Sequence, residues 1–390
     1  MLAWLMVIGC TPAPDDTADR WADLDFPPAG PGEAPDPSAW GPFSVGVTTI
    51  WLTDPDRDGP DGGPRDYPVE IWYPTADITG ALKSYPIADF VPNERLELEG
   101  ITADSLPLLH TSSYADAPPD RQHGPYPLVV FSHGNGGMRL QSMFYTEYLA
   151  SHGYVVASPD HVGNTLKDFL MPDAGSAFSA IAESFAYRPG DIERIVELLH
   201  GSDAVAPVSD GPWGMSGHSL GAWTALRAAA EMDNIGVTVA QAPPDIALAL
   251  VGTGTDPDEL GMPVLLQAGT LDRILDYEKN AVTTFTALAP PALMASYHGA
   301  GHFTFSDLCT LELGPVEDMI YDSLGNVLED GCGPKNPASE EIYPLLRFHA
   351  IGLINGVLRD SPESTEWMLA GPEAADASLF TMEGSLEVPQ

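Results

Sequence analysis

Residues 217–221 read Gly-His-Ser-Leu-Gly, a pattern in which Ser219 can act as a nucleophile. A short run with strand character ends at Ser216, and an Ala-rich helical segment begins at Leu220. Small residues on both sides of the serine let the strand and the helix approach closely, which places its hydroxyl on a tight, strained turn. The sequence therefore predicts a serine that attacks a carbonyl carbon.

A serine hydroxyl is a weak nucleophile until a base removes its proton during the attack. His302 is the favoured candidate for this base, because a Gly-rich loop at 299–301 carries it away from the last expected strand. His298 lies in the same stretch and is the competing candidate. It is less favoured because it is expected at the strand end and not in the loop.

The histidine needs an acidic partner that orients its ring and stabilises the imidazolium formed during attack. Asp272 follows the expected strand 263–269 and gives the chain order Ser, Asp, His. Asp245 follows the preceding strand and is the alternative acid. We favour Asp272, and both candidates remain open at this point.

Attack also creates an oxyanion, which needs N–H donors that are already in place. The backbone N–H of Leu220, directly after the nucleophile, is the expected first donor. The second is expected from the loop 133–137, His-Gly-Asn-Gly-Gly, whose glycines allow amides to turn inward. Asn135 is the preferred donor in this loop, followed by Gly134.

The elements that must position these residues alternate between strand and helix. Short apolar runs predict buried strands over 126–132, 154–158, 236–240, 263–269 and 293–297. Helical segments are expected near 139–151, 188–200, 220–232 and 340–357. This alternation predicts an α/β fold with a mostly parallel central sheet and helices on both faces.

The N-terminal part of the fold and its insertions depart from this alternation. Two β-rich runs, 43–51 and 67–74, predict a pair of antiparallel edge strands. Residues 75–124 lack a clear period and are expected to form an insertion after the early strands. A second insertion is expected at 303–345, after His302.

Composition limits the classes of partner. The chain has 390 residues, 44% of them hydrophobic, which is enough to build one large core. Sixteen Lys and Arg against 56 Asp and Glu give a net charge of −40, which repels nucleic acid and anionic membrane surfaces. We therefore expect no nucleic-acid partner.

The N-terminus resembles an export signal. Residues 1–10 form an apolar run that ends in Val-Ile-Gly-Cys, which resembles a bacterial lipobox. That resemblance implies cleavage before Cys10, lipidation of this cysteine, and a location in the bacterial cell envelope, in the outer membrane or periplasm. The run lacks the usual preceding Lys or Arg, and an uncleaved apolar terminus is the alternative.

Two further cysteines, Cys309 and Cys332, form an even pair if Cys10 carries lipid. In an oxidising compartment a disulfide between them is plausible and would contribute about 3 kcal/mol through loop entropy. Two separate buried thiols are the alternative.

These patterns divide the chain into four parts. Residues 1–10 are the signal-like segment, and 11–42 are rich in Pro, Asp, Ala and Gly, which predicts a disordered tether. The catalytic domain is expected over 43–360, followed by a C-terminal tail at 361–390.

The motifs together resemble the α/β-hydrolase superfamily. The resemblance rests on the loop 133–137, the segment 158–165, the pentapeptide 217–221 and the strand 68–74, with the Asp272 and His302 segments. The nearest branch is the platelet-activating-factor acetylhydrolase and predicted dienelactone-hydrolase-like group. True dienelactone hydrolases use a cysteine nucleophile, so their substrate is not implied for Ser219. The acetylhydrolases usually take their acid from the earlier strand, which keeps Asp245 in consideration.

The resemblance implies a serine esterase that cleaves short acyl esters, such as phospholipid acetyl esters or polyesters, without a metal or cofactor. A small-molecule or lipid ester is the expected partner, and the membrane is reached only through the N-terminal anchor. Peptidase or amidase activity with the same three residues is an alternative, and so is a non-catalytic surface lipoprotein.

Overall fold

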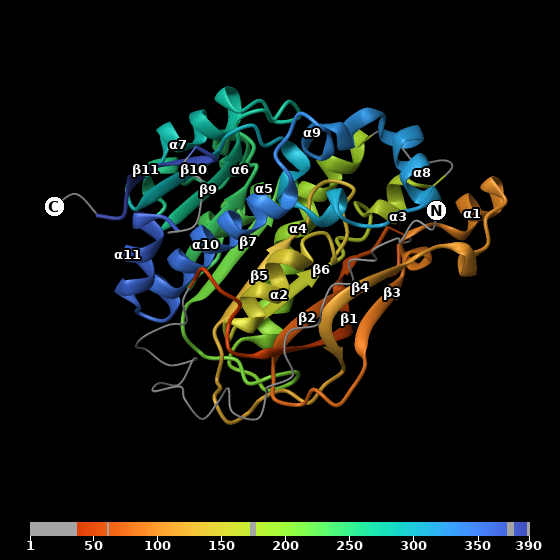
Figure 1. Ribbon diagram of the computed structural model, residues 1–390, viewed down its shortest axis with the longest axis horizontal. Coiled ribbons are helices and arrows are strands. Elements are labelled where there is room, and N and C mark those ends of the chain that lie inside the picture. Colours follow the sequence, from red (N-terminus) through yellow and green to blue (C-terminus); the bar gives the residue numbers. More distant parts are fainter. Residues whose placement is uncertain (1–36, 61, 172–176, 373–377, 388–390) are drawn as a thin grey trace, which may run out of the picture.

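A single mixed sheet organises the chain. The computed structural model describes residues 37–60, 62–171, 177–372 and 378–387. Its 11 strands lie in the order β11-β10-β9-β8-β7-β5-β6-β2-β1-β4-β3 (Figure 1). Their bounds are β1 (Ser44–Asp58), β2 (Pro64–Thr75), β3 (Leu82–Pro86), β4 (Leu108–Ala115), β5 (Leu128–Ser132), β6 (Val155–Pro159), β7 (Trp213–His218), β8 (Ile235–Gln241), β9 (Val264–Gly269), β10 (Ala292–Tyr297) and β11 (Phe380–Ser385).

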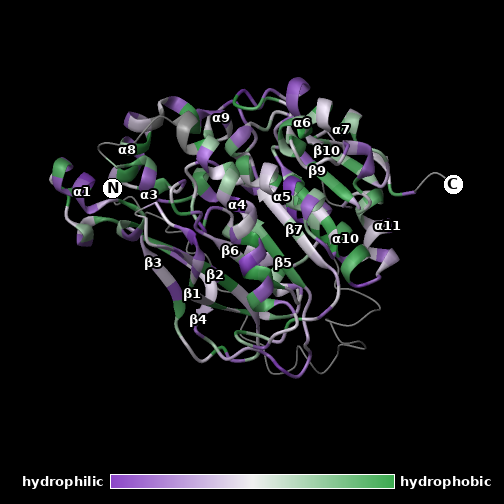
Figure 2. Cartoon of the chain, turned by 180° about the vertical axis from the view of Figure 1, so that it is seen from behind, coloured by the Kyte–Doolittle hydropathy of each residue, from purple (hydrophilic) through white to green (hydrophobic). Residues whose placement is uncertain are grey.

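The central strands, β5 to β10, are parallel to one another. Every residue of β5, β9 and β10 is buried, which is the pattern of strands covered on both faces. The expected parallel sheet is confirmed, and β9 and β10 are correspondingly hydrophobic in Figure 2.

Helices cover both faces of this sheet. Their bounds are α1 (Asn93–Glu99), α2 (Met143–Ser151), α3 (Leu166–Phe169), α4 (Ala177–Leu199), α5 (Leu220–Glu231), α6 (Ile246–Leu250), α7 (Thr283–Ala287), α8 (Pro315–Leu324), α9 (Glu329–Cys332), α10 (Ser339–Leu358) and α11 (Pro362–Ala370). Val129 and Phe131 of β5 belong to the core cluster that contains α2 and α10, whereas Leu128 and Val130 belong to the cluster that contains α4 and α5. Since successive side chains of a strand point to opposite faces, the two clusters lie on the two sides of the sheet.

The pair β1 and β2 differs from its predicted place. The two strands are antiparallel, as expected, and β2 continues the sheet by pairing with β6. They are not edge strands, because β4 pairs with β1 and β3 pairs with β4. Both outer strands come from the stretch 75–124. Burial alternates along most of β4, so it lacks the continuous apolar run by which the central strands are recognised.

The C-terminal segment also differs from the predicted tail. Helix α11 packs against α10, with Met368 buried between them, and β11 pairs antiparallel with β10. A side chain at Gly352 of α10 would collide with Met368, so this glycine permits the close approach. Residues of β11 are exposed or half-exposed, which explains their weak strand signal.

The N-terminal boundary of the folded domain also differs from the predicted one at residue 43. Residues 1–36, which contain the signal-like segment, Cys10 and most of the predicted tether, lie outside the described residues. Residues 37–42 are already packed: the Tyr148 hydroxyl donates to the Pro37 carbonyl, and the Trp40 ring lies 5.3 Å from that of Tyr148. Across the described part of the chain, no helix combines the length and the apolar composition that a membrane span needs.

Candidate active site

Ser219 occupies the turn between β7 and α5 in a backbone conformation that L-residues rarely adopt, with φ 57° and ψ −117°. A side chain at Gly217 would collide with the backbone of Gly221, and one at Gly221 would collide with the backbone of Ser132. The two glycines are therefore required by the close contact between α5 and the sheet. The strained turn places Ser219 at the N-terminus of α5.

His302 and Asp272 come to the same edge of the sheet from two other strands. His302 begins a short 3-10 helix after β10, and Asp272 follows β9. His302 Nε2 lies 2.9 Å from Ser219 Oγ, and its Nδ1 lies 2.7 Å from Asp272 Oδ2. Because a carboxylate accepts the Nδ1 proton, Nε2 is left to accept the serine proton.

The two alternative candidates have other partners. Asp245 is the N-cap of α6, where its carboxylate accepts the N–H of Ala247 at 3.0 Å. The exposed His298 hydrogen-bonds through Nδ1 to the Ser378 carbonyl at 2.8 Å. The structure thus brings Asp272, and not Asp245, to His302.

Asp330 connects the loops that carry Asp272 and His302. Its Oδ1 accepts the N–H of His302 at 3.3 Å, and its Oδ2 accepts the N–H groups of Arg273 at 2.8 Å and Ile274 at 3.0 Å. Asp330 is buried, and it follows His302 by nearly thirty positions. Sequence reasoning missed it, because nothing local distinguishes it among 56 acidic residues.

Cys309 and Cys332 form a disulfide in the structure. It links two positions of the predicted insertion after His302, on either side of α8. Leu308, Ile320 and Leu328 of this segment line a cavity of about 270 Å³ that also contains Ser219 and His302. The insertion thus forms an apolar wall beside Ser219.

Residues 134–137 of the loop 133–137 also line this cavity. A Cβ at Gly134 would lie 3.4 Å from the Cβ of Ser219, so the loop passes directly beside the nucleophile. The N–H of Gly134 donates to Gln141 Oε1 at 2.9 Å and is thereby occupied. The N–H groups of Gly136 and Gly137 donate to the carbonyls of Asn164 and Gly134, which leaves the backbone N–H of Asn135 as the loop's candidate donor.

Arg188 of α4 hydrogen-bonds to backbone carbonyls of this loop. Its guanidinium donates to the carbonyls of His133 at 2.6 Å and Gly134 at 3.1 Å. In a trans peptide the N–H points opposite to the carbonyl, so the Asn135 N–H is directed away from Arg188. Arg188 is fully buried, and burial lowers its pKa to about 9. Sequence reasoning missed this residue as well.

Gln141 and His218 tie this loop to the histidine. Gln141 Nε2 donates to His218 Nδ1 at 2.9 Å, and His218 Nε2 then donates to the His302 carbonyl at 3.0 Å. Burial, followed by the proximity of His302, holds the pKa of His218 well below its ordinary value. His218 therefore stays neutral and acts as a structural link.

The arrangement of the sheet and of the site is that of the α/β-hydrolase fold: Ser219 follows a central parallel strand, and Asp272 and His302 follow two later ones. Comparisons with known proteins agree. The family model of platelet-activating factor acetylhydrolase, isoform II, matches residues 64–167, about a quarter of the chain, and this match ends before Ser219.

One curated relative and one solved structure extend the comparison. Platelet-activating factor acetylhydrolase of Cavia porcellus is 29% identical over 170 residues, which cover 40% of this chain and 36% of the relative's length. A ferulic acid esterase from Streptomyces cinnamoneus has a similar structure, with a TM-score of 0.60 and 20% sequence identity, covering 85% of this chain and 94% of the esterase. The resemblance to α/β-hydrolases of the esterase type is thereby supported.

Proposed function

We propose that this chain is a serine hydrolase that cleaves carboxylic esters through an acyl-enzyme on Ser219. The observation that carries the proposal is the continuous hydrogen-bonded series from Ser219 through His302 to Asp272, with distances of 2.9 and 2.7 Å. Both the matched relative and the similar structure bear names of ester hydrolases, which supports the same class.

In the proposed mechanism, His302 Nε2 takes the proton of Ser219 while Oγ forms a bond to the ester carbonyl carbon. The tetrahedral intermediate collapses, the bond to the alcohol oxygen breaks, and the imidazolium of His302 protonates the leaving alcohol. Water then repeats the sequence on the acyl-enzyme and releases the carboxylic acid. Asp272 remains ionised throughout and stabilises the imidazolium.

The oxyanion is assigned to two backbone donors in this mechanism. The N–H of Leu220 is the first helical amide of α5, where N–H groups have no intrahelical partner. The N–H of Asn135 is the second, directed by the contact of Arg188 with the preceding carbonyl. Removal of one such donor typically reduces kcat by about 10²–10³-fold.

We assign short acyl groups to the apolar cavity. Its volume of about 270 Å³ lies below the usual range of pockets that bind drug-sized ligands. Phe303, Leu308 and Leu328 give it apolar walls. Acetyl esters, including those of phospholipids, and short polyester units are the proposed natural substrates.

A panel of p-nitrophenyl esters of increasing acyl length tests this function. We expect a burst of p-nitrophenol with the acetyl ester, a steep decline in kcat/KM with longer chains, and no burst in folded Ser219→Ala. Full activity in Ser219→Ala would refute the mechanism. Faster cleavage of the matching p-nitroanilide than of the ester would favour an amidase instead.

We further propose that the enzyme is exported and anchored in the bacterial cell envelope through lipidated Cys10. The support is the lipobox-like segment 7–10. Growth with a radioactive fatty acid should label the wild type but not Cys10→Ser. An unlabelled wild type would contradict the anchor while leaving the esterase proposal intact.

A further inference from the structure

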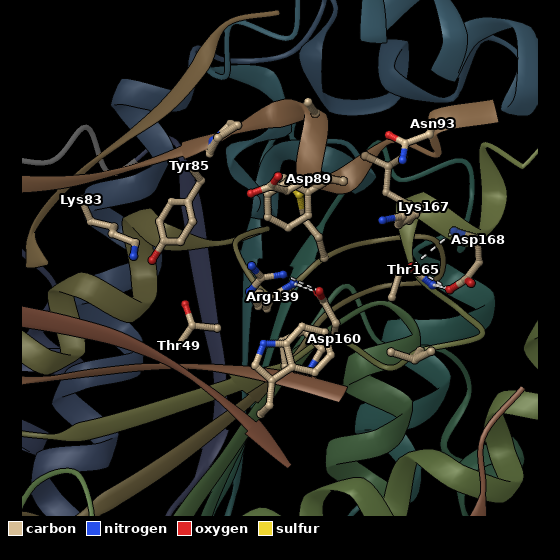
Figure 3. Close-up of a pocket in the computed structure, with 18 of the residues that line it drawn as sticks. Thr49, Lys83, Tyr85, Asp89, Asn93, Arg139, Asp160, Thr165, Lys167 and Asp168 are labelled. Atoms are coloured by element: carbon tan, nitrogen blue, oxygen red, sulfur yellow. Dashed lines mark hydrogen bonds and ion pairs between the residues drawn. The ribbon is translucent and has the colours of Figure 1, made fainter. Parts of the chain in front are cut away.

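A second cavity, of about 640 Å³, lies beside the pocket that holds Ser219. The two cavities share Met138 and Leu166 in their walls. A substrate that extends past these two side chains would therefore enter the second cavity. Figure 3 shows Lys83 and Lys167 pointing into it from opposite sides.

Lysines are rare in so acidic a chain. Only four occur in the sequence, against 56 acidic residues and a net charge of −40. Of the two that lie elsewhere, Lys279 is 3.8 Å from a carboxylate oxygen of Asp276, and Lys335 is exposed and forms no ion pair within the described residues. Neither Lys83 nor Lys167 forms an ion pair with any residue that the structure describes, and Lys83 Nζ lies 5.3 Å from the centroid of the Tyr85 ring.

Most carboxylates around this cavity are already bound by protein donors. Arg139, between the two lysines in Figure 3, is held by Glu70 at 3.1 Å and by Asp160 at 2.5 Å. Asp168 accepts hydrogen bonds from Gly163 and Thr165, which lie directly before α3. Asp89 is exposed and has no hydrogen bond within the described residues. Within the described residues, the cavity wall thus holds one carboxylate without a hydrogen bond, Asp89, and two lysines that form no ion pair.

We propose that this cavity is a subsite for a single anionic group, a carboxylate or a phosphate, carried by the alcohol portion of the ester. The inference rests on the proposed esterase function. A chain of charge −40 repels anions at long range, so an anionic substrate requires local cations that are not already neutralised. Lys83 and Lys167 supply two such cations next to the nucleophile's pocket, while Asp89 disfavours a polyanion.

Matched acetyl esters that differ only in the charge of the alcohol test the proposal. The carboxylate pair is 4-acetoxybutyrate and 4-acetoxybutyramide, and the phosphate pair is 1-acetylglycerol 3-phosphate and 1-acetylglycerol. For each pair the measured quantity is the ratio of kcat/KM for the anionic ester to that for the neutral one. We expect the wild type to favour one anionic ester by on the order of 10-fold.

Lysine variants then test whether Lys83 and Lys167 cause the preference for the anionic ester. The ratio should fall to about one in the K83Q/K167Q double variant and below one in K83E, whereas K279Q, on the outer surface, should keep the wild-type ratio. Preference in only one pair identifies the carboxylate or the phosphate as the ligand. A wild-type ratio of one or less in both pairs, or a ratio that survives K83Q/K167Q, would overturn the subsite. Failure of the wild type to hydrolyse even p-nitrophenyl acetate would instead count against the esterase function.

Discussion

Asp272 uses its two carboxylate oxygens for different purposes: Oδ2 contacts His302 Nδ1 at 2.7 Å, while Oδ1 accepts the N–H groups of Ile274 and Leu275 at 3.0 and 2.7 Å. The backbone contacts fix the carboxylate, so that it can fix the ring of His302. Asp245 has no comparable position, since its carboxylate caps a helix.

Replacing each acid by its amide separates the two candidates. We expect Asp272→Asn to reduce kcat on a short ester by about 10⁴-fold, because the amide no longer selects the His302 tautomer that accepts the serine proton. Asp245→Asn should keep nearly full activity, since asparagine is also a good N-cap. Equal losses in the two variants would contradict the assignment of the acid.

Arg188 is expected to act by positioning the loop 133–137. Arg188→Lys should lower kcat by about 10²-fold or more with little change in KM, because the oxyanion donor is lost while substrate binding remains. Steady-state kinetics on the acetyl ester measure both constants.

Arg359 offers a matched control for this variant. It is also buried and donates through Nη2 to two backbone carbonyls, those of His152 and Gly153, outside the active-site cavity. Arg359→Lys should cost a similar free energy of unfolding, about 1–3 kcal/mol, without the fall in kcat. If Arg188→Lys retains the wild-type kcat, Arg188 has no positioning role.

Stability should depend on pH through two buried carboxyl groups. Burial raises the pKa of Glu147 to about 7, although Ser112 and Ser113 donate hydrogen bonds to it, and burial likewise raises the pKa of Asp307 to about 7. Between the ordinary pKa and pH 7 the folded chain binds more protons than the unfolded chain. The free energy of unfolding therefore falls as pH rises through this range, by up to about 1.4 kcal/mol per pH unit for each group.

Glu147→Gln isolates one of these contributions. Glutamine keeps an acceptor oxygen and does not ionise, so the variant should gain stability relative to the wild type between pH 5 and pH 8. Urea unfolding at several pH values measures the difference. Glu197→Gln, at an exposed ion pair with Arg194, serves as the control and should show no such trend. A constant difference between Glu147→Gln and the wild type would refute the predicted linkage.

The disulfide should stabilise both the fold and the site. Its cysteines are separated by 23 positions, so a variant with both Cys309 and Cys332 replaced by serine should lose about 3 kcal/mol in the free energy of unfolding. Asp330 lies inside this loop and contacts both catalytic loops, so short-ester turnover should also fall. Urea unfolding and acetyl-ester kinetics measure the two effects, and unchanged values in both would contradict this role.

Local patterns were enough to predict the central strands and the types of residue in the site. Strand β5 and the first part of β9 are short apolar runs, and the turn at Ser219 requires the first and last glycines of its pentapeptide. The outer strands β3, β4 and β11 were missed, because a half-exposed strand has no such run and depends on its neighbour for its hydrogen bonds.

By itself, the sequence determined that a serine, a histidine and an aspartate follow strands of one parallel sheet. Chain order and the backbone constraints of each turn depend on residues that are adjacent in the sequence. Only the tertiary structure brought Asp272, rather than Asp245, into contact with His302, and only it joined Arg188 to the loop 133–137 and Asp330 to His302. These contacts link segments that are distant in sequence, and their hydrogen bonds exist only once the sheet has brought those segments together.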